Sequence, residues 1–212
     1  MIGERDEYEI QCDLIQRIIS EQQPLEIAMR DAIEVVKPGL SDESYIQLQE
    51  IDFGTVLVQS EEWIRYVLET EPPPMRVFAF WFGMFDTSDG PGDDEWQQMY
   101  ISGADRFEVD DEGEWACGCY WEPNSRYPNV PELELIGKLC PFRENQAGFT
   151  LSNSLVTALA VNHAKIISEV LGFKRGLFGR RKHSEYPIAC GHDAGDCVVV
   201  GYATSDGLRR PT

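Results

Sequence analysis

Apolar residues recur at helical spacing in the first part of the chain. Between residues 8 and 22 they fall three or four positions apart, and Pro24 ends this pattern. A second apolar stripe follows between Leu25 and Val36. The pattern predicts an N-terminal pair of amphipathic helices, residues 8–37, packed against each other.

The next part of the chain contains shorter apolar runs that are rich in β-branched residues. Residues 45–51 (YIQLQEI) and 55–59 (TVLVQ) predict two short strands. Ser60 is of a residue type that caps helices, and the spacing after it predicts a helix over residues 61–69. The three prolines at 72–74 cannot continue that helix and predict a rigid connector.

The most apolar stretch of the protein is MRVFAFWFGMF, residues 75–85. Prolines precede it and a turn-rich acidic run follows it, so a buried central strand fits better than a helix. The run QQMYIS, residues 97–102, is expected to pair back on it as a hairpin with a long acidic loop.

Two helices are predicted in the second half of the chain. Pro131 is suited to the first turn of a short helix that ends at Leu139. A longer helix is predicted over residues 152–171, with Gly172 as its stop signal. His163 lies on the apolar stripe of this helix, which favours a buried core histidine over a catalytic base.

The chain ends with predicted strands near residues 185–190 and 196–203. Helices cluster early and late in the chain around hairpin-like strands, and no internal repeat occurs, which indicates an α+β fold. We therefore expect one domain, residues 1–212, whose α+β core (45–203) contains a central mixed or antiparallel sheet of about four to six strands flanked by helices.

Charge is the strongest signal in the composition. The 212 residues include 37 acidic and 18 basic side chains, a formal net charge of −19. Such a charge repels phosphate backbones and anionic membranes and attracts cationic surfaces, so nucleic acid and membrane are not expected partners. The same surplus is also typical of proteins whose acidic surface serves solubility alone.

The chain has no pattern typical of export or of membrane insertion. No apolar run approaches the length of a membrane span, and the N-terminus MIGERDEYEI lacks a basic start and an apolar core. The six cysteines are expected to be reduced thiols, as in a cytoplasmic protein.

Two sets of residues could carry chemistry. Cys117, Cys119, Cys190 and His192 could converge on a zinc ion, but their single-residue spacers are not typical of zinc sites. His192 could form an acid–base group with Asp193 and Asp196, although GHDAGD is equally typical of a turn. No nucleophile elbow, zinc-protease or phosphate-loop motif occurs, and we predict no catalytic residue, no bound metal and no cofactor.

The segment ISGADRFEVDDEGEWACGCYWEPNSRYP, residues 101–128, combines many carboxylates with large aromatic side chains. Carboxylates attract Lys and Arg, and rigid rings anchor interfaces, so the segment is a candidate partner-binding surface. Alternatively, its tryptophans pin an ordinary loop to the core. A basic run, residues 173–183, could pair with this segment, contact another protein or remain a solvated loop. The candidate interface residues are Asp105, Glu108, Asp110, Asp111, Glu112, Glu114, Trp115, Tyr120, Trp121 and Tyr127.

The order of VFAFWFGMFDTSDG, MYISGADRFEVDDEGEWAC and YWEPNSRYPNVPEL, followed by GHDAGD, resembles a family of uncharacterised bacterial proteins. The resemblance covers residues 75–140 and 191–197. Members of this family are similar to immunity proteins encoded beside polymorphic or type VI secretion toxins. The chain departs from the family pattern at Met84, Ala104 and His192, which weakens the case for a shared ligand site.

The resemblance implies that the chain binds a cognate bacterial toxin with a basic surface and occludes its active site in the cytoplasm. The acidic composition agrees with such a partner. Two other functions remain open: a small cytoplasmic enzyme, such as a zinc-assisted hydrolase, and a structural or regulatory module.

Overall fold

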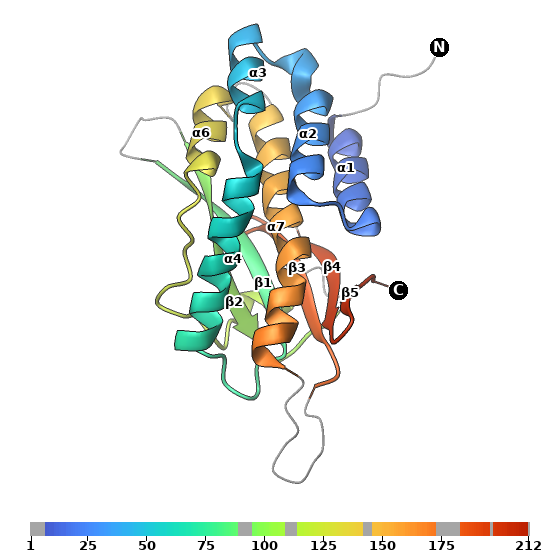
Figure 1. Ribbon diagram of the computed structural model, residues 1–212, viewed down its shortest axis with the longest axis vertical. Helices are drawn as coiled ribbons and strands as arrows, with labels where there is room; N and C mark the ends of the chain where they lie inside the picture. Colours follow the sequence, from blue (N-terminus) through green and yellow to red (C-terminus); the bar gives the residue numbers. More distant parts are fainter. Residues whose placement is uncertain are drawn as a thin grey trace.

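The computed structural model describes residues 7–88, 95–108, 114–141, 146–172, 183–195 and 197–211 (Figure 1). The helices in this part of the chain are α1 (Glu7–Glu21), α2 (Leu25–Val36), the 3₁₀ turn η1 (Lys37–Gly39), α3 (Asp42–Gln49), α4 (Phe53–Thr70), α5 (Glu114–Cys117), α6 (Pro131–Leu139) and α7 (Ala147–Leu171). The strands are β1 (Ala79–Thr87), β2 (Trp96–Ala104), β3 (Tyr186–His192), β4 (Cys197–Thr204) and β5 (Gly207–Arg209).

The strands form one mixed sheet in the order β2-β1-β3-β4-β5. β1 pairs antiparallel with β2 as a hairpin and parallel with β3 on its other side. β3–β4 and β4–β5 are antiparallel pairs, and the β3–β4 register shifts between Ile188 and Ala189. The α+β prediction with a single central sheet of about five strands is therefore confirmed.

Helix α7 is the centre of the core. It crosses one face of the sheet, and α1, α2, α4 and α6 pack around it (Figure 1). Among the described residues it is the one helix long and apolar enough to cross a membrane by composition, yet 78% of its most apolar window is buried inside the protein. Its apolar character is accounted for by this central position in the core.

The two faces of the sheet belong to separate hydrophobic clusters. Phe80, Phe82 and Ile188 point to the α7 side and join the large cluster with the helices. Trp81 and Ala189, which alternate with them, point to the opposite side and join a small cluster around α5. One face is thus covered by helices and the other only by a short segment.

Most of the predicted elements are present. The two N-terminal helices, the β1–β2 hairpin, α6, α7, β3 and β4 agree with the predicted ranges within a few residues. Helices α1 and α2 were expected to pack against each other, but both pack mainly on α7. Their apolar residues belong to the same hydrophobic cluster as one face of the sheet. The basic run 173–183 lies, except for its last residue, outside the described residues.

The two strands predicted over residues 45–51 and 55–59 are wrong, because both segments are helical. Helix α3 is capped by Ser41, whose hydroxyl accepts from the Ser44 amide. Helix α4 begins at Phe53 and is capped by Asp52, which accepts from the Thr55 amide at 3.2 Å. The β-branched residues favoured strands, but burial of one face of α4 against α7 overrides that local preference.

The predicted cap Ser60 lies instead in the middle of α4, facing α7. Its hydroxyl donates to the Leu57 carbonyl at 2.8 Å and lies 3.1 Å from His163 Nε2. Since the serine proton is already donated, His163 Nε2–H is the donor to Ser60. Nδ1 of His163 is buried without a hydrogen-bond partner in the described part of the chain, which confirms a core histidine.

Burial lowers the pKa of His163 from its ordinary value of 6.5 to about 3. The unfolded chain therefore binds a proton below about pH 6.5 that the folded chain excludes, and the folded state loses stability as the pH falls toward 3. His163→Leu should remove this dependence, so its unfolding free energy relative to wild type should rise by about 1.4 kcal/mol per pH unit below 6. Urea unfolding between pH 7 and pH 4 measures the difference. Parallel curves for the two proteins would contradict the assignment.

Candidate functional site

The described parts of the 105–127 segment cover the sheet face opposite α7 and the outer edge of β2. Trp115, in α5, is only 1% exposed, and its ring meets Trp81 at 6.4 Å and Phe107 at 5.0 Å between centroids. Both contacts are edge-to-face, the arrangement that aromatic rings prefer. Trp115 therefore holds the segment on the sheet.

Trp121 closes the edge of the sheet. Its backbone exchanges hydrogen bonds with Gly103 of β2, at 2.9 and 3.0 Å. Its indole is 7% exposed, donates to the Glu71 carbonyl at 3.0 Å and meets Phe80 edge-on. The prediction that Trp115 and Trp121 offer contact area to a partner is corrected accordingly, because both rings are buried in the core.

The carboxylates of the segment do not form one described cluster. Asp105 is paired within the chain: Arg76 donates to its Oδ2 from Nη2 at 2.5 Å and from Nε at 3.1 Å. Arg76 also stacks on the Tyr120 ring, with the guanidinium 3.9 Å from the centroid. Glu108 is exposed. Asp110, Asp111, Glu112 and the side chain of Glu114 lie outside the described residues.

Two aromatic residues of the segment are exposed, Tyr120 at 43% and Tyr127 at 48%. The second of these, Tyr127, belongs to a larger group of rings. It lies beside two rings that the sequence did not single out, Phe85 at 5.8 Å and Tyr100 at 6.3 Å between centroids. The Arg126 guanidinium lies 4.9 Å from the Tyr127 centroid. These side chains form an aromatic patch at the rim of the open sheet face.

Tyr100 is fixed in this patch by two hydrogen bonds. Its hydroxyl accepts from Trp81 Nε1 at 3.2 Å and donates to Asp193 Oδ1 at 2.7 Å. Gly83 lies against the Tyr100 ring, and a Cβ added at this position would lie 2.3 Å from it. Burial raises the pKa of Tyr100, and the hydrogen bond to Asp193 adds to this, so the phenol stays protonated at neutral pH.

The structure does not bring the alternative zinc ligands together. Cys190 faces α7, where its Sγ lies 3.3 Å from Thr157 Oγ1, whereas Cys119 lies on the opposite side of the sheet, 3.2 Å from Ser102 Oγ. The Cys117 side chain lies outside the described residues. Among the residues that are described, no group of three His, Cys, Asp or Glu side chains could hold a metal ion.

The alternative acid–base group is not assembled either. His192 Nδ1 accepts from the Ala194 amide at 3.0 Å, so its Nε2 carries the proton that Asp86 accepts at 3.0 Å. The next residue, Asp193, projects to the other face and accepts from Tyr100. Asp196 is not among the described residues. His192 and Asp193 thus stabilise the β3–β4 turn from opposite sides of the sheet.

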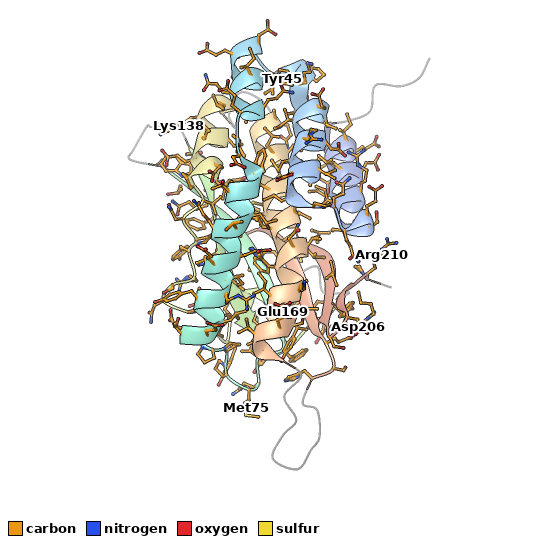
Figure 2. All side chains as sticks on the ribbon, viewed as in Figure 1. Tyr45, Met75, Lys138, Glu169, Asp206 and Arg210 are labelled. Carbon is orange, nitrogen blue, oxygen red and sulfur yellow. The ribbon has the colours of Figure 1, made fainter. Side chains whose placement is uncertain are left out.

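The excess negative charge lies before residue 114, both in the helices α1 to α4 and in residues 72–113, which include β1 and β2 and carry ten carboxylates and two Lys or Arg side chains. Residues 7–71, which form α1 to α4, carry 15 carboxylates and four Lys or Arg side chains. Residues 114–211 carry ten carboxylates and 11 Lys or Arg side chains, so that part is close to neutral. Oxygen-tipped side chains line the outer sides of α1 and α3 in Figure 2. Large exposed apolar side chains also lie on these four helices: Tyr8, Ile27, Ile46, Val58 and Tyr66.

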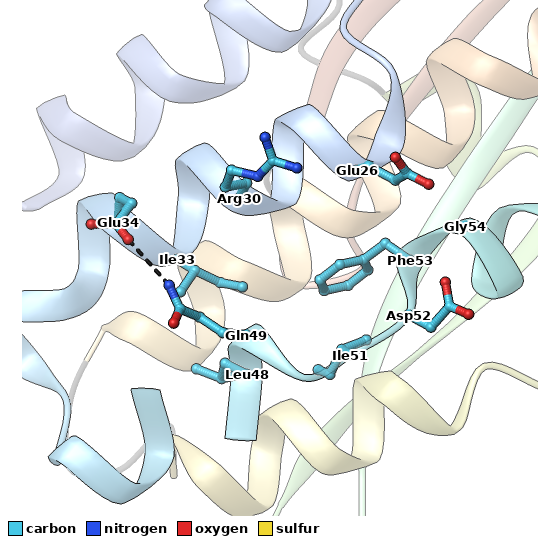
Figure 3. A pocket seen from close by; sticks show the side chains of 10 residues that line it. All are labelled: Glu26, Arg30, Ile33, Glu34, Leu48, Gln49, Ile51, Asp52, Phe53 and Gly54. Carbon is cyan, nitrogen blue, oxygen red and sulfur yellow. Dashed lines mark hydrogen bonds between the residues drawn. The ribbon is translucent and has the colours of Figure 1, made fainter. Parts of the chain in front are cut away.

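A groove of about 440 Å³ lies in this acidic layer, between α2 and the α3–α4 junction (Figure 3). Its floor is apolar, with Ile33, Leu48 and Phe53 all buried in the core. Its rim is polar and mostly acidic. The lining residues are Glu26, Arg30, Ile33, Glu34, Leu48, Gln49, Ile51, Asp52, Phe53 and Gly54.

Two of the three rim carboxylates have partners within the chain. Asp52 accepts from the Thr55 hydroxyl at 2.8 Å and from the Thr55 amide, and these bonds lower its pKa. Glu34 Oε1 accepts from the Tyr45 hydroxyl at 2.5 Å. Glu26 stands beside the first turn of α4, where Oε1 occupies space that a side chain at position 54 would fill. Glu26 is therefore the rim carboxylate best placed to receive a donor from outside.

Comparison with known proteins adds no relative to this description. No protein-family model matches the chain, and no curated protein or solved structure is similar to it. The function therefore has to be argued from the residues.

The 105–127 segment is also anchored to the end of α4, and this anchor can be tested. Glu71 accepts from the backbone amides of Asn124 at 2.6 Å and Ser125 at 3.0 Å, and these bonds lower its pKa. Glu71→Gln should speed amide hydrogen exchange at both positions, because one carboxylate oxygen is replaced by an NH₂ donor. Exchange NMR at pH 7 measures this, with Glu69→Gln as the control.

The pH dependence gives the same test without a mutation. The lowered pKa keeps Glu71 ionised below its usual range, so protection of the two amides should persist at pH 4.5 and fall only at lower pH. Unchanged exchange in Glu71→Gln would mean that this carboxylate does not hold the segment.

Proposed function

We propose that this chain is a cytoplasmic immunity protein that binds a cognate bacterial toxin and neutralises it by covering its active site. The observation that carries the proposal is the unbalanced negative charge of α1 to α4, which carry 15 carboxylates against four Lys or Arg side chains. Exposed apolar side chains are interspersed with those carboxylates. Charged groups that surround apolar contacts are typical of a protein-binding surface.

The charge distribution supports binding over solubility as the reason for the acid surplus. Charge that serves solubility needs no preferred place, whereas the unbalanced carboxylates here lie before residue 114, and residues 114–211 are close to neutral. A one-sided field orients an approaching basic protein and increases its association rate. The expected partner is therefore a protein with a basic surface.

We propose a different position for the interface from the one expected from the sequence. With Trp115 and Trp121 buried and Asp105 paired to Arg76, the described part of the 105–127 segment offers few contacts beyond Tyr120 and Tyr127. The acidic helices offer more charge and more exposed apolar area. We assign the main contact to α1 to α4, and the acidic loop residues 110–112 remain a second candidate.

The gene next to this one in its genome should encode the toxin, and co-expression tests that. Expression of the neighbouring product alone should stop bacterial growth, and expression together with this chain should restore growth. A neighbouring product that is harmless, or that stays toxic in the presence of this chain, contradicts the proposal.

Charge reversal then separates the two candidate surfaces. Replacing Glu9, Glu43 and Glu62 of the helices with Lys should lower the association rate with the toxin by about tenfold at low salt and flatten its salt dependence. Replacing Asp110, Asp111 and Glu112 with Lys is the matched change in the loop and should have a smaller effect. Stopped-flow fluorescence measures both rates. Equal rates for wild type and both variants would exclude charge-steered binding.

A further inference from the structure

We propose that the groove between α2 and the α3–α4 junction receives an arginine or lysine side chain from a basic, amphipathic segment of the partner protein. This inference rests on the proposed function, since it names the place and the chemistry of the contact. The groove combines three features that such a side chain requires, namely an apolar floor, a flanking apolar surface and an acidic rim (Figure 3).

The apolar part of the groove suits the stem of a long cationic side chain. Ile33 and Phe53 point toward the space between the helices, and Ile51 lies between them on the α3–α4 junction (Figure 3). Lys and Arg lay their methylene groups along apolar surface while the charged head stays in water. At about 440 Å³ the groove is within the size range of ligand-binding clefts.

Exposed apolar residues continue this surface outside the groove. Each lies one helical turn from a lining residue on its own helix, because residues three or four positions apart are neighbours on a helix surface. The three pairs are Ile27 with Arg30 on α2, Ile46 with Gln49 on α3, and Val58 with Gly54 on α4. A partner segment that fills the groove can therefore bury apolar side chains on either side of its cation.

The acidic rim sets the charge of the occupant. The ten lining residues include three carboxylates, Glu26, Glu34 and Asp52, and one cation, Arg30. Glu26 makes no hydrogen bond or ion pair in the described part of the chain, and its position beside α4 leaves its carboxylate exposed. A guanidinium or ammonium group bound there would form a charge-assisted hydrogen bond. An anionic occupant would meet two or more carboxylates.

Arg30 competes with an incoming cation for the carboxylates of the groove. It is exposed and stands four residues from both Glu26 and Glu34 on α2, the spacing at which a cation interacts with carboxylates of the same helix. An incoming cation must share these carboxylates with Arg30. Removal of the Arg30 charge should therefore strengthen binding, which no loss of structure would explain.

The first experiment uses small probes in place of the partner. Hexylguanidinium titrated into the full chain should shift the NMR methyl signals of Ile33 and Ile51 with saturation, and added salt should weaken this binding. Hexanol tests the apolar contribution and should bind more weakly, and hexanoate should not bind. Equal binding of hexanol and hexylguanidinium, or no saturable shift with the cation, would overturn the inference.

Three variants test the charges. Glu26→Gln should weaken hexylguanidinium binding by about threefold and Arg30→Gln should strengthen it by a similar factor, as expected for exposed charge pairs. Glu62→Gln is the matched control on α4, with the same loss of charge outside the groove, and should bind as wild type does. Weaker hexylguanidinium binding by Arg30→Gln, or an equal loss of affinity in Glu26→Gln and Glu62→Gln, would show that the groove does not select a cation.

The same variants in the toxin assay distinguish this inference from the proposed function. If the toxin binds tightly and neither Glu26→Gln nor Arg30→Gln changes its affinity, the groove is not part of the interface and the immunity function stands. If no toxin is bound but the cationic probe occupies the groove as described, the immunity function fails and the cation site stands.

Discussion

The structure depends on the burial of α7 between the sheet and four other helices. A helix buried on nearly every side must be apolar all round, and its polar side chains need partners on the helix itself or on the elements packed against it. Ser154 donates to the Thr150 carbonyl at 2.8 Å and Ser168 to the Lys165 carbonyl at 2.8 Å. Alanines at 158, 160 and 164 reduce the bulk of the helix where neighbours pack on it. Helices α1, α2, α4 and α6 are each positioned by their contact with α7.

Burying α7 on one face leaves the other face of the sheet with only the one-turn helix α5. A single short segment has to cover that face, and a few large rings can do so with little chain. This explains why residues 105–127 are rich in aromatic side chains: Trp115 packs on Trp81, and Trp121 closes the edge of β2. It also explains Gly83, whose missing side chain gives room for Tyr100 on the same face.

The sequence predicted those elements whose local pattern agrees with their tertiary environment. The predicted strand 75–85 is apolar on both faces. In the structure, β1 lies inside the sheet with both of its faces covered. The predicted helix over residues 61–69 lies within α4, but the first part of α4 was predicted as a strand because its β-branched residues favour one and because Ser60 suggested a helix start. Only the partner across the core, His163, explains that serine, and it lies 103 residues away.

The candidate site was less predictable for a related reason. A tryptophan in an acidic stretch has the same sequence signature whether it is exposed as an anchor or buried as a hinge, and here the Glu71 carbonyl and the Phe80 ring bury Trp121. The groove has no local signature at all, since it is lined by α2, the end of α3 and the start of α4.

Part of the acidic surplus has a structural cause, and the rest does not. Asp52 caps α4, and Glu26 lies beside its first turn, where the helix dipole favours a negative charge. Glu34 holds Tyr45. The remaining carboxylates of α1 to α4 exceed what the three described ion pairs of these helices, Arg17–Asp31, Lys37–Glu34 and Arg65–Glu169, can balance. Mutual repulsion within that layer destabilises the folded state, while the almost neutral half after residue 114 shows that this fold does not require it. We therefore propose that a partner of opposite charge relieves this repulsion when it binds.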